Sequence, residues 1–353
     1  MDKAQKYGKL NGVVSQSTHP NHLETEQEVP MDLEDSKKQD LNLQSTVNQS
    51  ILSTQTSEEL INQKDSLDIS NIANQSNLSI SEEILSPNLK DSKEFYSFKK
   101  EYLEEVYQNL LLDENCFYKK INPNYMANQT SITFKMRAIL VDWLIDVHYR
   151  CGMKKKTLFN CIYIIDAFLS KKFVDKKNLQ LLGMAALLIA CKESEIIFPS
   201  LNVILAFSEN AYSKEELLDM ERKIIKELNF DILAPTAEEF YEINAQLFNF
   251  LDEQKYLGEY FLDSSLIDSN FLKYRQSTVA VACCYIVMKF FKLSDVHLVI
   301  ENTYVDVKQK EVKDCARELC FLVRNLSSSS LGATKSKYMS EKYLKVAKYC
   351  ESN

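Results

Sequence analysis

The chain of 353 residues is poor in the residues that build β-hairpins and metal sites: it has six glycines, six prolines and four histidines. So few glycines leave little material for tight hairpin turns, and no run alternates apolar and polar residues long enough to predict a sheet. A glycine-rich phosphate loop and an HExxH motif are also missing. We therefore expect an all-α, non-enzymatic protein without catalytic residues, metal or cofactor.

Cysteine and histidine motifs are equally scarce. All nine cysteines follow residue 115 and none forms a CxxC pair, which indicates reduced core residues of an intracellular protein. His148 and His297 have no Cys or second His at metal spacing, so we expect both at helix surfaces. Apolar runs such as 179–191 span only about a dozen residues, whereas a membrane crossing needs roughly 20. With no secretory signal in the polar opening either, we expect a soluble protein without membrane contact.

Charge is concentrated in the first part of the chain. Residues 1–92 carry 7 lysines and no arginine against 15 acids, which accounts for the whole net charge of −8. With Tyr7 as its only aromatic residue, this acidic tail is expected to be disordered. The Ser86-Pro87 step could accept a phosphate, but in so polar a segment it is more often incidental, and we assign it no role. The electrically neutral remainder disfavours nucleic-acid binding.

From residue 93 onward the periodicity is helical. An N-terminal helix and loop are expected over 93–132, followed by two helical units over 133–235 and 236–350. Capping boxes at Ser213/Glu216 and Thr236/Glu239 mark two helix starts, and Asp306 with Gln309 marks a third. The helices are expected at 133–150, 155–170, 176–194, 200–208 and 213–229 in the first unit, and at 237–250, 253–269, 274–292 and 306–325 in the second.

The segment 135–150, KMRAILVDWLIDVHYR, is apolar on nearly every face of a helix. One stripe follows the spacing i, i+3, i+4 and i+7, and Asp146 extends it. Such a helix must be wrapped by neighbours. The stripe consists of Met136, Ile139, Leu140 and Trp143.

Four blocks in order, MRAILVDWL, NLQLLGMAALLIACK, MERKIIKELNFDI and LGEYFLDSSLIDSNFLKY, resemble the A/B-type mitotic cyclins over roughly 93–350. The resemblance implies two tandem five-helix cyclin boxes, here called box 1 (133–235) and box 2 (236–350). It further implies a non-catalytic subunit, in the nucleus and cytoplasm, that binds and activates a cyclin-dependent kinase. Such a subunit docks Arg-x-Leu substrates or inhibitors and controls cell-cycle progression at G2/M or S phase.

The resemblance assigns kinase binding to a set of residues in box 1. From the residues alone, an exposed Lys and Glu would read as a solvated pair, and a phenylalanine such as Phe230 would serve equally well as core filler. The implied kinase-binding residues are Lys192, Glu221, Ile225, Phe230 and Ile232.

The resemblance also assigns a docking groove and an internal ion pair. The groove would bind the leucine of an Arg-x-Leu peptide while Asp146 receives its arginine; from the residues alone the stripe is ordinary core. Arg137 and Asp166 would form a structural ion pair, since unpaired charges in apolar helices are costly. The implied groove residues are Met136, Ile139, Leu140, Trp143, Leu179 and Gln180.

Several positions depart from the family pattern. Glu193, Ser194 and Glu195 stand where an aromatic and two acids are usual, and Ser200 stands where a second proline would follow Pro199, so the choice of kinase is open. No arginine precedes residue 137, so the Arg-x-x-Leu destruction box is missing, as is a Lys-Glu-Asn box. A rival interpretation is a cyclin-fold transcription or nucleic-acid adaptor, which the balanced charge disfavours.

Overall fold

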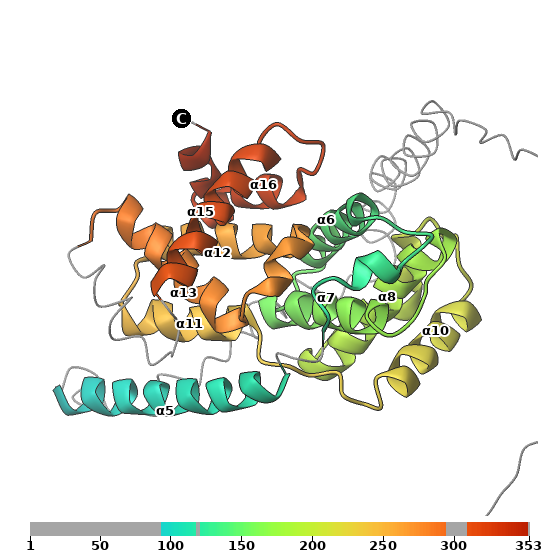
Figure 1. Ribbon diagram of the computed structural model, residues 1–353, viewed down its shortest axis with the longest axis horizontal. Coiled ribbons are helices and arrows are strands. Elements are labelled where there is room, and N and C mark those ends of the chain that lie inside the picture. Colours follow the sequence, from blue (N-terminus) through green and yellow to red (C-terminus); the bar gives the residue numbers. More distant parts are fainter. Residues whose placement is uncertain (1–92, 118–120, 294–308, 352–353) are drawn as a thin grey trace, which may run out of the picture. The chain divides into compact units, whose positions relative to one another are not determined.

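The computed structural model describes residues 93–117, 121–293 and 309–351, and within these ranges every regular element is a helix (Figure 1). The all-α prediction is confirmed for this part of the chain. The acidic tail 1–92, Asp306 and His297 lie outside the described residues. The α-helices before residue 234 are α5 (Lys93–Phe117), α6 (Phe134–Arg150), α7 (Lys155–Leu169), α8 (Leu179–Ser194), α9 (Leu201–Ala206) and α10 (Lys214–Glu227). Those after it are α11 (Ala237–Leu247), α12 (Asp252–Ile267), α13 (Gln276–Phe290), α15 (Gln309–Leu326) and α16 (Ala333–Tyr338).

The α-helix ends lie within three residues of the expected boundaries, apart from one helix that begins as a 3-10 turn. The helix expected at 176–194 begins as the 3-10 turn η3 (Lys176–Asn178) and continues as α8. Box 2 also contains α16, which the periodicity did not predict because six residues are too few to show one. The remaining 3-10 turns are η2 (Tyr125–Asn128), η4 (Ser269–Lys273), η5 (Glu341–Tyr343) and η6 (Val346–Cys350).

In box 1 the central helix is α8, which packs against α7 and α10. Its small residues Ala185, Ala186 and Ala190 are fully buried, so that neighbouring helices can approach closely. Gly183 allows the same approach from α6, because a Cβ there would lie 2.8 Å from a methyl carbon of Leu140.

In box 2 the corresponding helix is α13, enclosed by α11, α12 and α15. The residues Ala280, Ala282 and Cys283 are fully buried in it. α5 contacts α11 and lies across box 2 from α16 (Figure 1). Both boxes are thus built around a helix rich in small residues.

The capping boxes expected at Ser213 and Thr236 are in place, and Thr133 caps α6 in addition. Thr133 accepts a hydrogen bond from the backbone of Met136, and Ser213 and Thr236 form complete capping boxes with Glu216 and Glu239. Each cap satisfies backbone N–H groups that a helix start leaves without partners.

Three other helix starts are capped by a carboxylate from a distant element. Glu195 accepts from the backbone of Lys154 at the start of α7 (2.7 Å), and Glu114 of α5 accepts from the backbone of Ser277 in α13 (2.9 Å). Asp142 of α6 accepts from the backbone of Ala333 in α16 (3.0 Å). These starts carry no side-chain cap of their own, so their N–H groups are satisfied only when the elements dock.

No helix in the described ranges combines the length and the apolar character that a membrane crossing demands. All nine cysteines are free thiols. Cys116 and Cys320 are exposed and Cys151 and Cys350 half-buried, so the expectation that the cysteines are core residues is wrong for these four. Each of them lies near a helix end or on an outward helix face, where solvent reaches the side chain.

Candidate functional site

The structure brings Lys192 and Glu221 together. The ammonium of Lys192, in the last turn of α8, lies 2.6 Å from the carboxylate of Glu221 in α10. The side chains are 46% and 15% exposed, so this is a surface pair whose own contribution to stability is at most about 1 kcal/mol. Both groups can still offer hydrogen bonds to a partner that covers them.

Phe230 is 78% exposed, so the interpretation of it as core filler is wrong. α10 ends at Glu227, after which Asn229 and Phe230 both adopt left-handed conformations (φ 51° and 62°). The backbone of Phe230 donates to the carbonyl of Ile225 (3.1 Å), which fixes this tight turn. The ring therefore stands outside the core, while Ile225 and Ile232 are half-buried. A large apolar side chain held in water is a feature of binding surfaces.

The stripe on α6 is buried rather than open. Met136, Ile139, Leu140, Trp143 and Leu179 are between 4% and 7% exposed, and Gln180 is half-buried. The stripe is thus packed as core, as its apolar spacing alone indicates, and the docking role remains a prediction.

Asp146, at the end of that stripe, already has a partner. The guanidinium of Arg150, one turn further along α6, lies 2.8 Å from its carboxylate. Both side chains are about a third exposed, so the carboxylate is accessible to solvent. A peptide arginine would have to compete with Arg150 for it.

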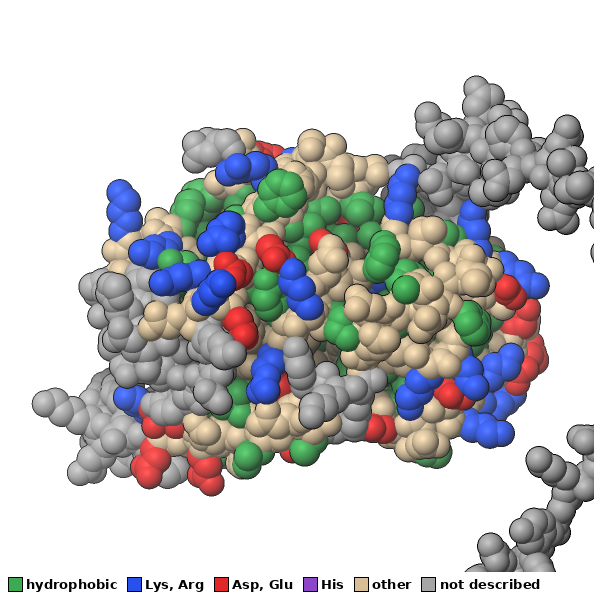
Figure 2. All heavy atoms as spheres, viewed as in Figure 1, with side chains coloured by type: hydrophobic (Ala, Val, Ile, Leu, Met, Phe, Trp, Pro, Cys, Tyr) green, Lys and Arg blue, Asp and Glu red, His purple; other side chains and the backbone are tan. Residues whose placement is uncertain are grey.

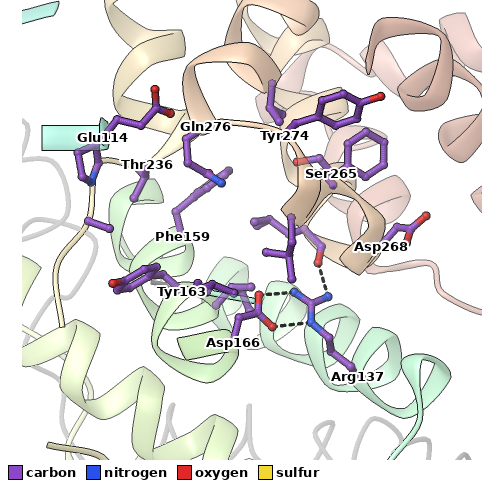
Figure 3. A pocket seen from close by; sticks show the side chains of 18 residues that line it. Glu114, Arg137, Phe159, Tyr163, Asp166, Thr236, Ser265, Asp268, Tyr274 and Gln276 are labelled. Atoms are coloured by element: carbon purple, nitrogen blue, oxygen red, sulfur yellow. Dashed lines mark hydrogen bonds and ion pairs between the residues drawn. The ribbon is translucent and has the colours of Figure 1, made fainter. Parts of the chain in front are cut away.

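Arg137 and Asp166 form the expected ion pair, and the pair also joins the two boxes. Two nitrogens of the guanidinium lie 2.6 Å and 2.7 Å from the carboxylate oxygens, and the third donates to the carbonyls of Leu266 (2.9 Å) and Ile267 (3.3 Å) in α12 (Figure 3). Burial opposes the charge on Arg137, but Asp166 more than offsets it and raises the pKa of the guanidinium. Tyr125 donates to the same carboxylate (2.7 Å).

A second buried ion pair, Lys337 with Asp263, connects α16 with α12 at 2.7 Å. Burial acts against the charged carboxylate, yet Lys337 and Lys155 lower the pKa of Asp263. His148 of α6 lies in the same region and is 3% exposed, so its expected position at a helix surface is wrong. α16 and α12 cover that face of α6. Burial, reinforced by Lys337, lowers the pKa of His148 to about 4, so its ring is neutral near pH 7.

A cavity of about 100 Å³ lies between the boxes beside the linker residue Pro235. Its charged lining groups are already engaged. Arg137 pairs with Asp166 (Figure 3), Glu114 accepts from the hydroxyl and backbone of Ser277, and Asp268 accepts from the backbone of Asn270. No nucleophile lies beside a general base among these lining residues, and no cluster that could hold a metal ion occurs in the described part of the chain.

Comparison with known proteins gives two adjacent family matches. The model of the cyclin N-terminal domain matches residues 105–233, and that of the cyclin C-terminal domain matches residues 235–352. Together they span more than half of the chain. The chain belongs to the cyclin family. The tandem boxes expected from the sequence are therefore confirmed, and the relatives place this cyclin with the mitotic, B-type members.

Three curated relatives illustrate the similarity. The cyclin is 34% identical over 249 residues to the G2/mitotic-specific cyclin-B of Hydra vulgaris (70% of this chain, 67% of that protein). The corresponding protein of Hydra viridissima is 33% identical over 250 residues (70% and 62%). Cyclin-B2-1 of Oryza sativa subsp. japonica is 38% identical over 185 residues (52% and 44%). This cyclin thus spans less than two thirds of the length of the last two.

Among solved structures, a viral cyclin from herpesvirus saimiri matches with a TM-score of 0.48 and 19% identity. The match covers 68% of this chain and 99% of the viral one.

Several contacts at these sites had no signal in the sequence. Tyr125, Lys337 and Asp263 pair with groups far along the chain, which periodicity does not reveal. Ile196 and Ile197, 81% and 69% exposed, did have a signal: two isoleucines directly after a helix and just before Pro199.

Proposed function

We propose that this cyclin is the non-catalytic regulatory subunit of a cyclin-dependent kinase, which it binds through Lys192, Glu221, Ile225, Phe230 and Ile232. The observation that supports this best is the Lys192–Glu221 pair, in which the Lys192 side chain is 46% exposed, together with Phe230 at 78% exposure just after α10, the helix that carries Glu221. Aromatic anchors beside polar groups that become desolvated on binding are typical interface hot spots.

The proposed mechanism is a population shift. Lys192 can donate to backbone carbonyls and Glu221 can accept from backbone N–H groups of a docked helix, whereas Phe230 needs an apolar pocket. If only the active arrangement of the kinase presents these partners together, binding favours that arrangement in proportion to the difference in affinity. The cyclin then contributes no reacting group.

The partner is a protein rather than nucleic acid or membrane. On the face seen in Figure 2, Lys and Arg side chains are intermixed with Asp and Glu, and apolar side chains reach the surface in separate groups. A nucleic-acid-binding face normally carries a continuous basic field that neutralises phosphates.

The test is a kinase activation assay with matched variants. Lys192→Ala with Glu221→Ala, and separately Phe230→Ser, should reduce activation of a purified cyclin-dependent kinase by roughly 10-fold or more without changing the melting temperature. The controls are Lys273→Ala with Glu318→Ala, which removes a similarly exposed ion pair in box 2 (47% and 41%), and Phe321→Ser (67% exposed). Full activation by the Lys192/Glu221 and Phe230 variants would reject the proposed surface.

We also propose that the α6 stripe with Leu179, Gln180 and Asp146 docks Arg-x-Leu peptides. Its support is the family membership and the solvent-accessible Asp146 carboxylate; the buried stripe requires that the groove opens for the peptide. The similarity to G2/mitotic-specific cyclins supports action in mitosis rather than S phase. A mitotic role would place the protein in the nucleus and cytoplasm.

A further inference from the structure

The loop that follows α8 presents two isoleucines to solvent. Ile196 is 81% and Ile197 is 69% exposed, and no other large apolar side chain whose exposure the structure describes exceeds Ile196. Ile196 lies four residues after Lys192, so the loop continues directly from the proposed kinase-binding surface. Exposure of two such side chains to water is unfavourable unless a partner covers them.

Glu195 at the start of this loop and Glu193 at the end of α8 both bond to residues at or near the start of α7. The carboxylate of Glu195 accepts from the backbone of Lys154 (2.7 Å) and from the hydroxyl of Thr157, and Glu193 accepts from the amide of Asn160 (2.9 Å). Thr157 and Asn160 are buried, at 0% and 1% exposure. Both carboxylates thereby have partners within box 1, and the Glu193 side chain is exposed to solvent.

The same contacts hold the loop in one conformation. Besides donating its backbone N–H to the Glu195 carboxylate, Lys154 donates from its ammonium group to the carbonyl of Ser194 (2.9 Å). Glu195 also caps the start of α7, where its negative charge is favourable. Because Ser194 and Glu195 are both bonded to Lys154, the start of the loop loses little conformational freedom when a partner binds, which favours affinity.

We propose that Ile196 and Ile197 form a second, apolar contact with the kinase and select kinases whose facing surface is apolar rather than basic. This inference rests on the proposed kinase-binding function. Glu195 acts as a positioning residue, because its hydrogen bonds hold the start of the loop against α7 while the isoleucines stay exposed. An uncharged contact of this kind depends little on salt, unlike one made by exposed carboxylates.

The experiment measures binding of the whole chain to a panel of purified cyclin-dependent kinases at low and at high salt. Ile196→Ser with Ile197→Ser should weaken binding to the best kinase by about 10- to 100-fold at either salt concentration, with unchanged melting. Leu251→Ser, at a site 69% exposed in box 2, is the control and should bind like the wild type. Ile196→Glu with Ile197→Glu should shift preference toward kinases with a basic facing surface and make binding salt-dependent.

The two proposals fail in different ways. If the serine variant binds like the wild type while Lys192→Ala with Glu221→Ala loses binding, the isoleucine contact is wrong and the kinase-binding surface stands. If the wild type and the Lys192/Glu221 variant bind equally, the proposed function is wrong and this inference with it. A glutamate variant that keeps the wild-type kinase preference would overturn the selection role.

Discussion

Asp142 in α6 accepts a hydrogen bond from the backbone N–H of Ala333 in α16, 191 positions along the chain. The carboxylate belongs to box 1 and the capped helix to box 2. Burial raises the pKa of Asp142 to about 6, although the bond from Ala333 opposes this rise. The Asp142 carboxylate therefore stabilises the start of α16 as a hydrogen-bond acceptor, while the partial burial of its charge is unfavourable.

The first prediction concerns this cap. Asp142→Ala should lower the free energy of unfolding by about 1 kcal/mol, because the start of α16 loses its acceptor. Asp142→Asn keeps a carbonyl acceptor without the buried charge and should cost less. Thermal melting near neutral pH checks both variants. An alanine variant as stable as the asparagine variant would show that the cap contributes nothing.

The second prediction concerns the buried pair of Arg137 and Asp166. Asp166→Leu alone should destabilise the protein by about 3–5 kcal/mol, since it leaves the Arg137 charge buried without its counter-ion. Arg137→Met with Asp166→Leu should recover much of that loss. Because Arg137 also donates to Leu266 and Ile267, the double variant should still unfold more readily than the wild type. Chemical denaturation of the three proteins measures the differences, and equal stability of single and double variants would contradict the argument.

Much of the fold could be predicted because local patterns determine it. The capping residues Thr133, Ser213 and Thr236 are short-range signals, and the small-residue helices at 179–194 and 276–290 are visible in the sequence alone. The contacts of His148 could not be predicted. Its surroundings come from α12 and α16, and no local period encodes which face of α6 those helices cover.

In the candidate site, too, the sequence alone leaves some features unpredicted. The Lys192–Glu221 contact was expected only through family resemblance, since side chains 29 residues apart on two helices show no joint pattern. Whether Phe230 is core or surface depends on two left-handed residues after α10. Asn tolerates this conformation, but Phe rarely adopts it, so the sequence alone does not predict whether the Phe230 ring is buried or exposed.

The third prediction concerns Arg150, which lies 2.8 Å from the Asp146 carboxylate. If Asp146 receives the arginine of an Arg-x-Leu peptide, Arg150→Ala removes a competitor and should strengthen peptide binding by a few-fold, given the modest value of an exposed pair. Asp146→Asn should weaken it. Fluorescence anisotropy with a labelled Arg-x-Leu peptide measures both, and an Ala-x-Ala peptide is the control. Unchanged affinity in both variants would exclude Asp146 from docking.

The fourth prediction concerns pH. Burial, together with Glu242, Glu239 and Glu259 and against the opposing effect of Lys155, raises the pKa of Glu238 to about 7. The folded protein therefore retains a proton that the unfolded chain releases near pH 4.5. The contribution of this group to the free energy of unfolding therefore falls as the pH rises from about 4.5 to about 7, and it stays low above pH 7.

Glu238→Gln removes this pH-dependent loss. The melting temperature of the variant relative to the wild type should increase from about pH 5 to about pH 8. Glu105→Gln, at an exposed position on α5, is the matched control and should show no such trend. A constant difference for Glu238→Gln across this range would show that the carboxyl group titrates normally.

The helix starts capped by Glu195, Glu114 and Asp142 bear on how the protein folds. Each cap forms only after segments 41, 163 and 191 residues apart have met. Contacts between residues so far apart in the sequence slow folding, because the entropy cost of closing the intervening chain comes before the contact contributes any stability. The Asp142 cap also crosses between the boxes, so the start of α16 in box 2 is satisfied only when box 1 has formed, and calorimetry should record one cooperative transition for both.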